Sequence, residues 1–237
     1  MKKRNLELKV LDLAKTELDK LYGFYNIDES QNDRPDAAIN VIEPRSDFDE
    51  KNPSFKVGIE ITSVDKEDVQ AYFNDQTYGI NKINEAFAEN KKNGGKINHA
   101  NKKMEIFVDE FYIYEGAMKK LKKHEDYAKS NIFKDIILIC HSENTNSNKL
   151  LREWTNFLLS KENFPFDKVL FTALETQKCF LIYEKKKPLL TEPRPFNHVR
   201  HQRAEITIPI GHHNILGALL NEPIIQPKKS AKRTKKH

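Results

Sequence analysis

Two strand-like runs decide the fold: DAAINVIE at residues 36–43 and FKVGIEIT at residues 55–62. Both runs are rich in residues that favour β-strands. The segment between them contains residues typical of turns, namely Pro44, Asp47, Asp49, Asn52 and Pro53. The sequence therefore predicts a long antiparallel hairpin.

This hairpin is expected to bring two acids together. Side chains alternate along a strand, so in the second run Glu60 and Thr62 lie on the face opposite the apolar odd-numbered residues. A loop centred near residue 49 would place Asp36 opposite Thr62 and diagonal to Glu60. Neighbouring carboxylates repel unless they share a cation, and Mg²⁺ is usually held by one or two carboxylates together with waters and phosphates. We therefore expect Asp36 and Glu60 to bind Mg²⁺ or Mn²⁺.

Helices and strands alternate along most of the chain. Apolar periodicity predicts helices at residues 6–22, 68–90, 112–129 and 150–159, and further strands at residues 135–141, 168–174 and 179–183. The run DIILICH at residues 135–141 is continuously apolar, as in strands that are buried on both faces. This pattern predicts the α/β class.

Composition shifts near the C-terminus. After Lys187 the chain becomes rich in proline, and residues 228–237 hold six lysines and arginines but no acid. We expect an α/β domain over residues 1–187, an extension over residues 188–226 packed on or beside it, and a basic disordered tail over residues 227–237.

Charge and cysteine content exclude several classes. The formal net charge of +5 comes from the tail, so the rest of the chain is close to neutral. No apolar stretch approaches the roughly 20 residues that span a bilayer, so we expect no membrane insertion. Two cysteines within apolar runs do not form a secreted disulfide framework. These features favour a cytoplasmic protein.

A third carboxylate is expected on the first helix. Glu17 falls between Leu6 and Val10 on the helical wheel, within the apolar stripe that should pack on the sheet. A buried acid needs a compensating partner. Glu7 also falls on this arc, but it lies near the helix start, where fraying and the helix dipole make an acid unremarkable.

Together these residues carry a resemblance. Arg34-Pro35-Asp36, followed by Gly58-Ile59-Glu60-Ile61-Thr62, resembles the PD-(D/E)XK, or restriction-endonuclease-like, nuclease superfamily. The resemblance covers roughly residues 6–185 and implies an αβββαβ core with a mixed central sheet flanked by helices. It also implies that Asp36 and Glu60 bind Mg²⁺, that Glu17 assists them, and that a lysine two positions after the second acid acts on the attacking water.

The lysine is where the chain departs from this pattern. Position 62 is Thr, which forms hydrogen bonds but carries no positive charge. In some branches of the superfamily a neighbouring helix supplies the lysine. On the helix expected at residues 112–129, Lys120 lies at the margin of the apolar face, whereas Lys119, Lys122 and Lys123 point outward. We expect Lys120 to replace the missing lysine, with Thr62 beside it.

The implied function is metal-dependent hydrolysis of phosphodiester bonds, with DNA as the expected substrate. The alternative is a catalytically inactive nuclease-fold protein that binds nucleic acid or a protein partner, which the missing lysine supports. A homodimer remains open. Basic residues outside the core are expected to contact phosphates, or simply to lie in solvent: Arg194, Arg200, Arg203, Lys228, Lys229, Lys232, Arg233, Lys235 and Lys236.

Overall fold

The chain divides into two compact units. The computed structural model describes residues 2–31, 34–44, 54–69, 100–196 and 200–208. One unit comprises Met1–Asp65 and Val108–Val199, and the other comprises Lys66–Phe107 and Arg200–His237. Residues 66–107, which we expected within a first domain over residues 1–187, therefore group with the C-terminal segment. The first unit also extends past residue 187.

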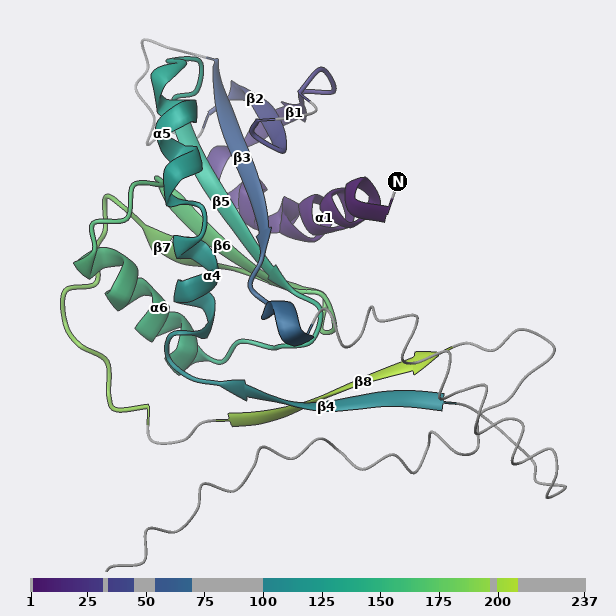
Figure 1. Cartoon of the computed structure of the whole chain (residues 1–237). Helices are drawn as coiled ribbons and strands as arrows, with labels where there is room; N and C mark the ends of the chain where they lie inside the picture. The colour runs from purple at the N-terminus through teal and green to yellow at the C-terminus, as the bar shows by residue number, and fades with distance from the viewer. Residues whose placement is uncertain (1, 32–33, 45–53, 70–99, 197–199, 209–237) are drawn as a thin grey trace, which may run out of the picture. The chain divides into compact units, whose positions relative to one another are not determined.

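A six-stranded mixed sheet forms the centre of the first unit (Figure 1). In spatial order its strands are β1 (Phe24–Ile27), β2 (Ala37–Glu43), β3 (Phe55–Ser63), β5 (Asp135–Ser142), β6 (Lys168–Ala173) and β7 (Lys178–Glu184). The first three strands are antiparallel to one another, β3, β5 and β6 are parallel, and β7 runs antiparallel to β6. The predicted α/β class and mixed sheet are confirmed.

Helices flank this sheet on both sides (Figure 1). On one side α1 (Lys2–Tyr22) buries Val10, Ala14 and Leu18 against the odd-numbered side chains of β3 and β5. On the other side lie α4 (Tyr112–Met118), α5 (Leu121–Lys129) and α6 (Lys149–Lys161). In the described part of the chain, no helix has the length and apolar content needed to cross a membrane.

Strand β5 explains why the central strands are so apolar. All eight of its residues are buried, because parallel neighbours pair with both edges and helices cover both faces. Burying each isoleucine or leucine contributes about 1.5–3 kcal/mol. Any polar group on these strands therefore requires partners within the protein.

The register of the hairpin differs from the predicted one by two residues. Ala37 pairs with Ile59, and Val41 pairs with Phe55. The strands end unevenly, because β2 continues past its last pair with β3 and Glu43 pairs with Phe24 of β1 instead. Continued by one residue, this register places Asp36 opposite Glu60 rather than Thr62.

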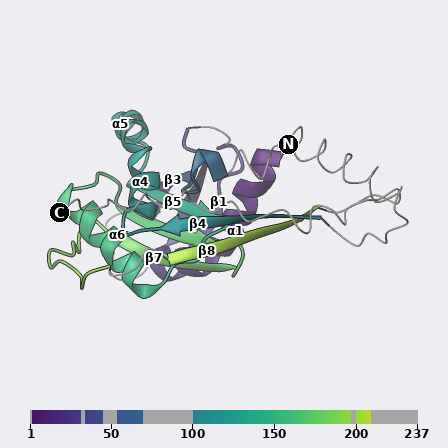
Figure 2. The ribbon, with the colours of Figure 1, turned by 60° about the horizontal axis from the view of Figure 1, so that its bottom comes forward.

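Three further elements differ from expectation. The single helix expected at residues 112–129 is divided into α4 and α5, with Lys120 between them. Strand β1 was not expected. In the second unit, β4 (Ala100–Val108) and β8 (Arg200–Ile208) form a two-stranded sheet and lie side by side (Figures 1 and 2). Most of the helix expected at residues 68–90 lies outside the described residues.

Candidate active site

Asp36 lies directly before β2 and is fixed to β3. Its Oδ2 accepts a hydrogen bond of 2.8 Å from the N–H of Ile61, and its backbone oxygen accepts one of 3.1 Å from Arg4 Nη1. Burial raises the pKa of the Asp36 carboxyl; the Ile61 N–H acts against this rise, while the charges of Glu60 and Glu7 add to it. The Asp36 carboxylate is therefore held beside a second carboxylate.

Glu60 is that second carboxylate, and it is fully buried on β3, at 0% exposure. Its Oε1 accepts hydrogen bonds of 2.7 Å from both Lys120 Nζ and Lys123 Nζ, and its Oε2 accepts one of 2.6 Å from the Tyr127 hydroxyl. Burial alone would raise the pKa of Glu60, but the hydrogen bonds from these three donors outweigh it and lower the pKa. Glu60 is therefore held as an anion.

The three donors come from one side of the segment that contains α5. Lys120, Lys123 and Tyr127 are spaced i, i+3 and i+7, which places them on one face of a helix. Lys120 occupies the position before α5, at the break that ends α4. Lys123 was expected to point outward, but it contacts Glu60 as closely as Lys120 does. The seven-residue spacing that ends at Tyr127 was the sequence signal for this arrangement.

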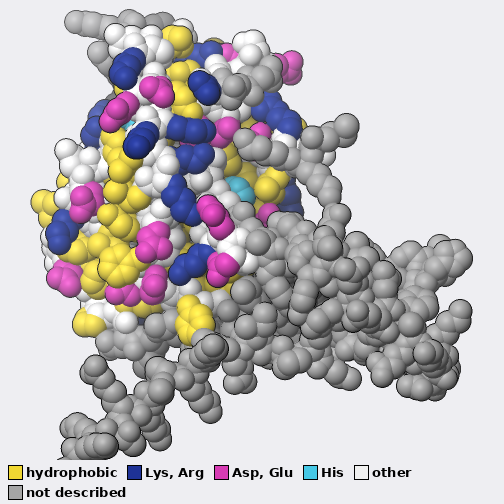
Figure 3. All heavy atoms as spheres, viewed as in Figure 1, with side chains coloured by type: hydrophobic (Ala, Val, Ile, Leu, Met, Phe, Trp, Pro, Cys, Tyr) yellow, Lys and Arg dark blue, Asp and Glu magenta, His cyan; other side chains and the backbone are white. Residues whose placement is uncertain are grey.

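Basic side chains are common on this side of the molecule. Figure 3 shows lysine and arginine side chains gathered over the region of α4 and α5, with acidic side chains between them. Lys123 contributes a side chain that is 46% exposed, whereas the Lys120 side chain is 18% exposed. The Lys123 side chain is thus more exposed than that of Lys120.

Thr62 follows Glu60 on the same face of β3 and is buried. Its hydroxyl donates to the backbone oxygen of Ser63 over 3.4 Å, which is longer than an ordinary O–H···O hydrogen bond. Lys120, rather than Thr62, supplies positive charge at Glu60.

Glu17 does not join this site. It accepts a hydrogen bond of 2.7 Å from Lys20 Nζ, and its charge adds to the effect of burial in raising the pKa of Cys179 on β7 to about 11. Strand β7 lies four strands from β2 in the sheet, roughly 19 Å away at the usual strand spacing. The expectation for Glu17 is therefore not met. It failed because the helical wheel gives the face of a residue but not its height along α1.

Glu7 is the glutamate of α1 that acts on the site. Its charge contributes to the raised pKa of Asp36, and Arg4, one turn earlier, contacts the Asp36 backbone. The position near the helix start, for which we set Glu7 aside, is what brings it to Asp36.

His141, a residue of β5, was not among the sequence candidates. It lies near Glu7 of α1. Burial lowers its pKa, while the charges of Asp65 and Glu7 act in the opposite direction. Its Nδ1 is buried and has no hydrogen-bond partner among the described residues. His141 therefore adds an unpaired nitrogen near the first turns of α1.

Asp65, by contrast, has a structural role. It accepts hydrogen bonds from the Tyr112 hydroxyl at 3.0 Å, from the Ser142 hydroxyl, and from the N–H of Glu143 at 2.9 Å. These bonds join Asp65, two residues after β3, to α4 and to the end of β5.

The donor set of Asp36 and Glu60 fits a hard divalent cation. Carboxylate oxygens suit Mg²⁺ and Mn²⁺, and Mg²⁺ commonly takes only one or two protein carboxylates. Within the described ranges, no group of three or more His, Cys, Asp or Glu side chains could hold a metal. A cation held by Asp36 and Glu60 would take its remaining ligands from water and substrate.

The basic residues expected to contact phosphate are only partly described. Arg194 is exposed, and its backbone oxygen accepts a hydrogen bond of 3.0 Å from Trp154 Nε1. Arg200 and Arg203 belong to β8 in the second unit. The tail residues Lys228, Lys229, Lys232, Arg233, Lys235 and Lys236 lie outside the described residues.

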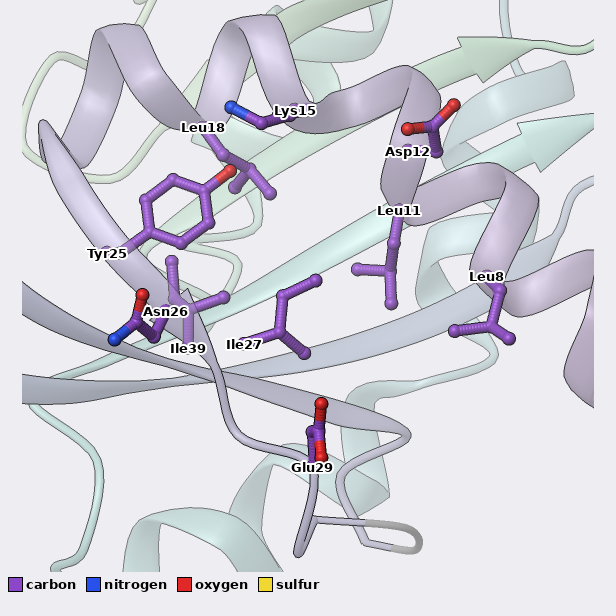
Figure 4. A pocket seen from close by; sticks show the side chains of 10 residues that line it. All are labelled: Leu8, Leu11, Asp12, Lys15, Leu18, Tyr25, Asn26, Ile27, Glu29 and Ile39. Atoms are coloured by element: carbon purple, nitrogen blue, oxygen red, sulfur yellow. The ribbon is translucent and has the colours of Figure 1, made fainter.

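A groove of about 600 Å³ lies between α1 and β1, away from Glu60 (Figure 4). Its floor is mainly apolar and includes Leu8, Leu11, Leu18 and Ile39. Both acidic and basic side chains also line it, so it has no consistent charge for a phosphate.

Comparison of the chain with protein-family models, with curated proteins and with solved structures finds no match. The geometry around Asp36 and Glu60 is therefore the main indication of function.

Proposed function

We propose that the chain is a metal-dependent nuclease that hydrolyses phosphodiester bonds, with DNA as its substrate class. One observation carries the proposal: Asp36 and Glu60 lie together at the β2–β3 hairpin, and Lys120 Nζ lies 2.7 Å from Glu60 Oε1. Within the first unit a helix, three antiparallel strands, further helices and a parallel strand occur in this order, which supports a restriction-endonuclease-like core.

Each residue at the site has a role in the proposed reaction. Asp36 and Glu60 would hold the cation. When bound, Mg²⁺ supplies a water of lowered pKa and neutralises charge on the phosphoryl group. Lys120 would orient the attacking water or the scissile phosphate through its ammonium. The water oxygen bonds to phosphorus and releases a proton to solvent as the phosphorus–oxygen bond to the leaving group breaks, and the leaving oxygen takes up a proton from solvent.

The second candidate is a nuclease-fold protein that binds nucleic acid without cutting it. Three donors already occupy the two oxygens of Glu60, and residue 62 is Thr rather than Lys. These observations favour a site in which Glu60 only fixes α5 to β3. Such a protein would bind DNA equally well with and without Mg²⁺.

Cleavage assays separate the two candidates. Supercoiled and linear DNA are incubated with the full chain in Mg²⁺ or Mn²⁺, and the Asp36→Asn, Glu60→Gln and Glu17→Gln variants are compared with wild type. The nuclease proposal expects metal-dependent cleavage that is lost in the first two variants and retained in Glu17→Gln, the matched control from α1. Absence of cleavage in wild type, or its survival in Asp36→Asn and Glu60→Gln, would overturn it.

A further inference from the structure

We propose that Lys123 exchanges between Glu60 and a nucleic-acid phosphate, so that the cation and the nucleic acid bind this site cooperatively. The inference rests on the proposed function and adds a regulatory step to it. In the free protein Lys123 covers Glu60 Oε1. When a phosphate draws Lys123 away, that oxygen becomes available to the cation.

The charges at the site provide the driving force. Two carboxylates, Asp36 and Glu60, face two ammonium groups, Lys120 and Lys123, so these four side chains are together neutral. A divalent cation would add two positive charges beside two ammonium groups, and like charges repel strongly where burial reduces solvent screening. A phosphate supplies the negative charge that offsets this excess.

Geometry and exposure indicate that Lys123, rather than Lys120, is the lysine that leaves Glu60. Both ammonium groups lie 2.7 Å from the same oxygen, so one must leave before a cation can bind there. The Lys123 side chain is 46% exposed, whereas that of Lys120 is 18% exposed. A lysine carries its charge on a flexible four-carbon stem, so Lys123 can turn toward a phosphate in solvent.

The remaining contacts keep Glu60 in place during this exchange. Tyr127, which is 5% exposed, donates to the other oxygen, Oε2, over 2.6 Å. Lys120 stays near Oε1, where the proposed reaction needs a positive charge. Glu60 would therefore lose one donor rather than its whole set of contacts.

Thermodynamic linkage gives the expected size of the effect. Coupling between two binding sites is reciprocal and commonly changes affinity by about 5- to 150-fold. The test measures Mn²⁺ affinity from the electron paramagnetic resonance signal of free Mn²⁺, using the full chain with and without phosphorothioate DNA, which stays charged but resists hydrolysis. We expect DNA to tighten Mn²⁺ binding by at least about fivefold.

Two variants isolate the role of Lys123. Lys123→Met should bind Mn²⁺ more tightly than wild type without DNA, and DNA should then add little. Lys122→Met is the matched control, because Lys122 is exposed on the same helix, and it should keep the wild-type coupling. Equal Mn²⁺ affinity with and without DNA, or wild-type coupling in Lys123→Met, would overturn the inference.

The same experiment distinguishes failure of the inference from failure of the proposed function. If Asp36→Asn abolishes Mn²⁺ binding but Lys123→Met behaves like wild type, only the exchange is wrong. If wild type binds no Mn²⁺, or if Asp36→Asn binds it unchanged, the metal site is wrong and the exchange fails with it.

Discussion

Two buried carboxylates on the same sheet have similar partners but different surroundings. In the Asp135 cluster (Tyr22, Asp135 and Lys168), Asp135 Oδ2 accepts hydrogen bonds of 2.6 Å from Lys168 Nζ and 3.0 Å from the Tyr22 hydroxyl. In the Glu60 cluster (Asp36, Glu60, Lys120, Lys123 and Tyr127), Glu60 is likewise held by lysine and tyrosine. The two carboxylates lie on opposite faces of the sheet.

The two clusters differ in the exposure of their lysine side chains and in the number of charged groups that they contain. Lys168 is one ammonium paired with one carboxylate, its side chain is 10% exposed, and it also lies 5.0 Å from the centre of the Tyr22 ring. The Glu60 cluster adds a second carboxylate, Asp36, and a second ammonium, that of Lys123, whose side chain is 46% exposed. We therefore expect the Asp135 cluster to matter for the fold alone, and the Glu60 cluster to exchange partners and bind a ligand.

Replacing one lysine in each cluster should produce the largest contrast. Lys120→Met should lower the rate of DNA cleavage by about 10²- to 10³-fold, the usual cost of removing one group that positions and stabilises charge in the transition state. Lys168→Met should leave the rate per folded molecule unchanged, because Lys168 contacts Asp135 on the other face. Single-turnover cleavage, corrected for the folded fraction by circular dichroism, measures both. Equal losses in the two variants would remove the distinction between the clusters.

The free energy of unfolding, unlike the cleavage rate, should depend more on the Asp135 cluster than on the Glu60 cluster. Asp135→Asn should lower the free energy of unfolding by about 3–5 kcal/mol, because it leaves the charge of Lys168 buried without its partner. The double variant Asp135→Leu with Lys168→Met should recover much of this loss, since an apolar pair needs no charge compensation. Urea denaturation provides the comparison. A small effect of Asp135→Asn would show that the Asp135 cluster is not the structural one.

Ionisation of the two carboxylates of the Glu60 cluster should change the stability of the folded state in opposite directions. The pKa of Glu60 is lowered, so its ionisation stabilises the folded state above its ordinary value of 4.5, and this contribution is lost as the pH falls through the lowered pKa. The pKa of Asp36 is raised above 3.8, so its ionisation costs stability as the pH rises through the raised pKa.

Urea denaturation from pH 3 to 7 tests this pair. Glu60→Gln should flatten the loss of stability in acid. Asp36→Asn, whose amide oxygen can still accept the Ile61 N–H, should raise stability at pH 7 relative to its effect at pH 3. Changes of the same sign in both variants would contradict the charge arrangement.

The smallest expected effect concerns the basic tail. Deleting residues 228–237 removes six positive charges and should weaken DNA binding at low salt, with little effect at high salt or on Mn²⁺ affinity. Fluorescence anisotropy over a series of salt concentrations measures this effect. Unchanged binding at low salt would show that the tail is not a phosphate tether.

Sequence reasoning succeeded where the periodicity was strong. The apolar run of β5, the hairpin strands and the amphipathic pattern of α6 predicted those elements, and alternation along the hairpin predicted that Asp36 and Glu60 would converge. The predicted register was wrong by two residues. It assumed a loop centred near residue 49, and the turn residues of the loop do not show where each strand stops pairing. Strand β1, with only four residues, gave too little pattern to detect.

The positions of the helices against the sheet, which the sequence pattern does not give, limited the prediction of the site. The wheel of α1 selected Glu17 by its face, but α1 brings Glu7 to Asp36 and places Glu17 near Cys179. The helical wheel also predicted that Lys123 would point outward, whereas Lys120 and Lys123 both contact Glu60 on the side of the segment that carries Tyr127. Such positions depend on packing between elements, which local periodicity does not encode.

The central claim is that Asp36 and Glu60 jointly hold a divalent cation. Anomalous diffraction from crystals of the full chain with phosphorothioate DNA and Mn²⁺ locates the cation directly. We expect a peak within roughly 2.0–2.5 Å of a carboxylate oxygen of both Asp36 and Glu60, with Lys123 turned away from Glu60. A peak elsewhere, or none at these carboxylates while Lys120 and Lys123 both remain on Glu60, would contradict the account.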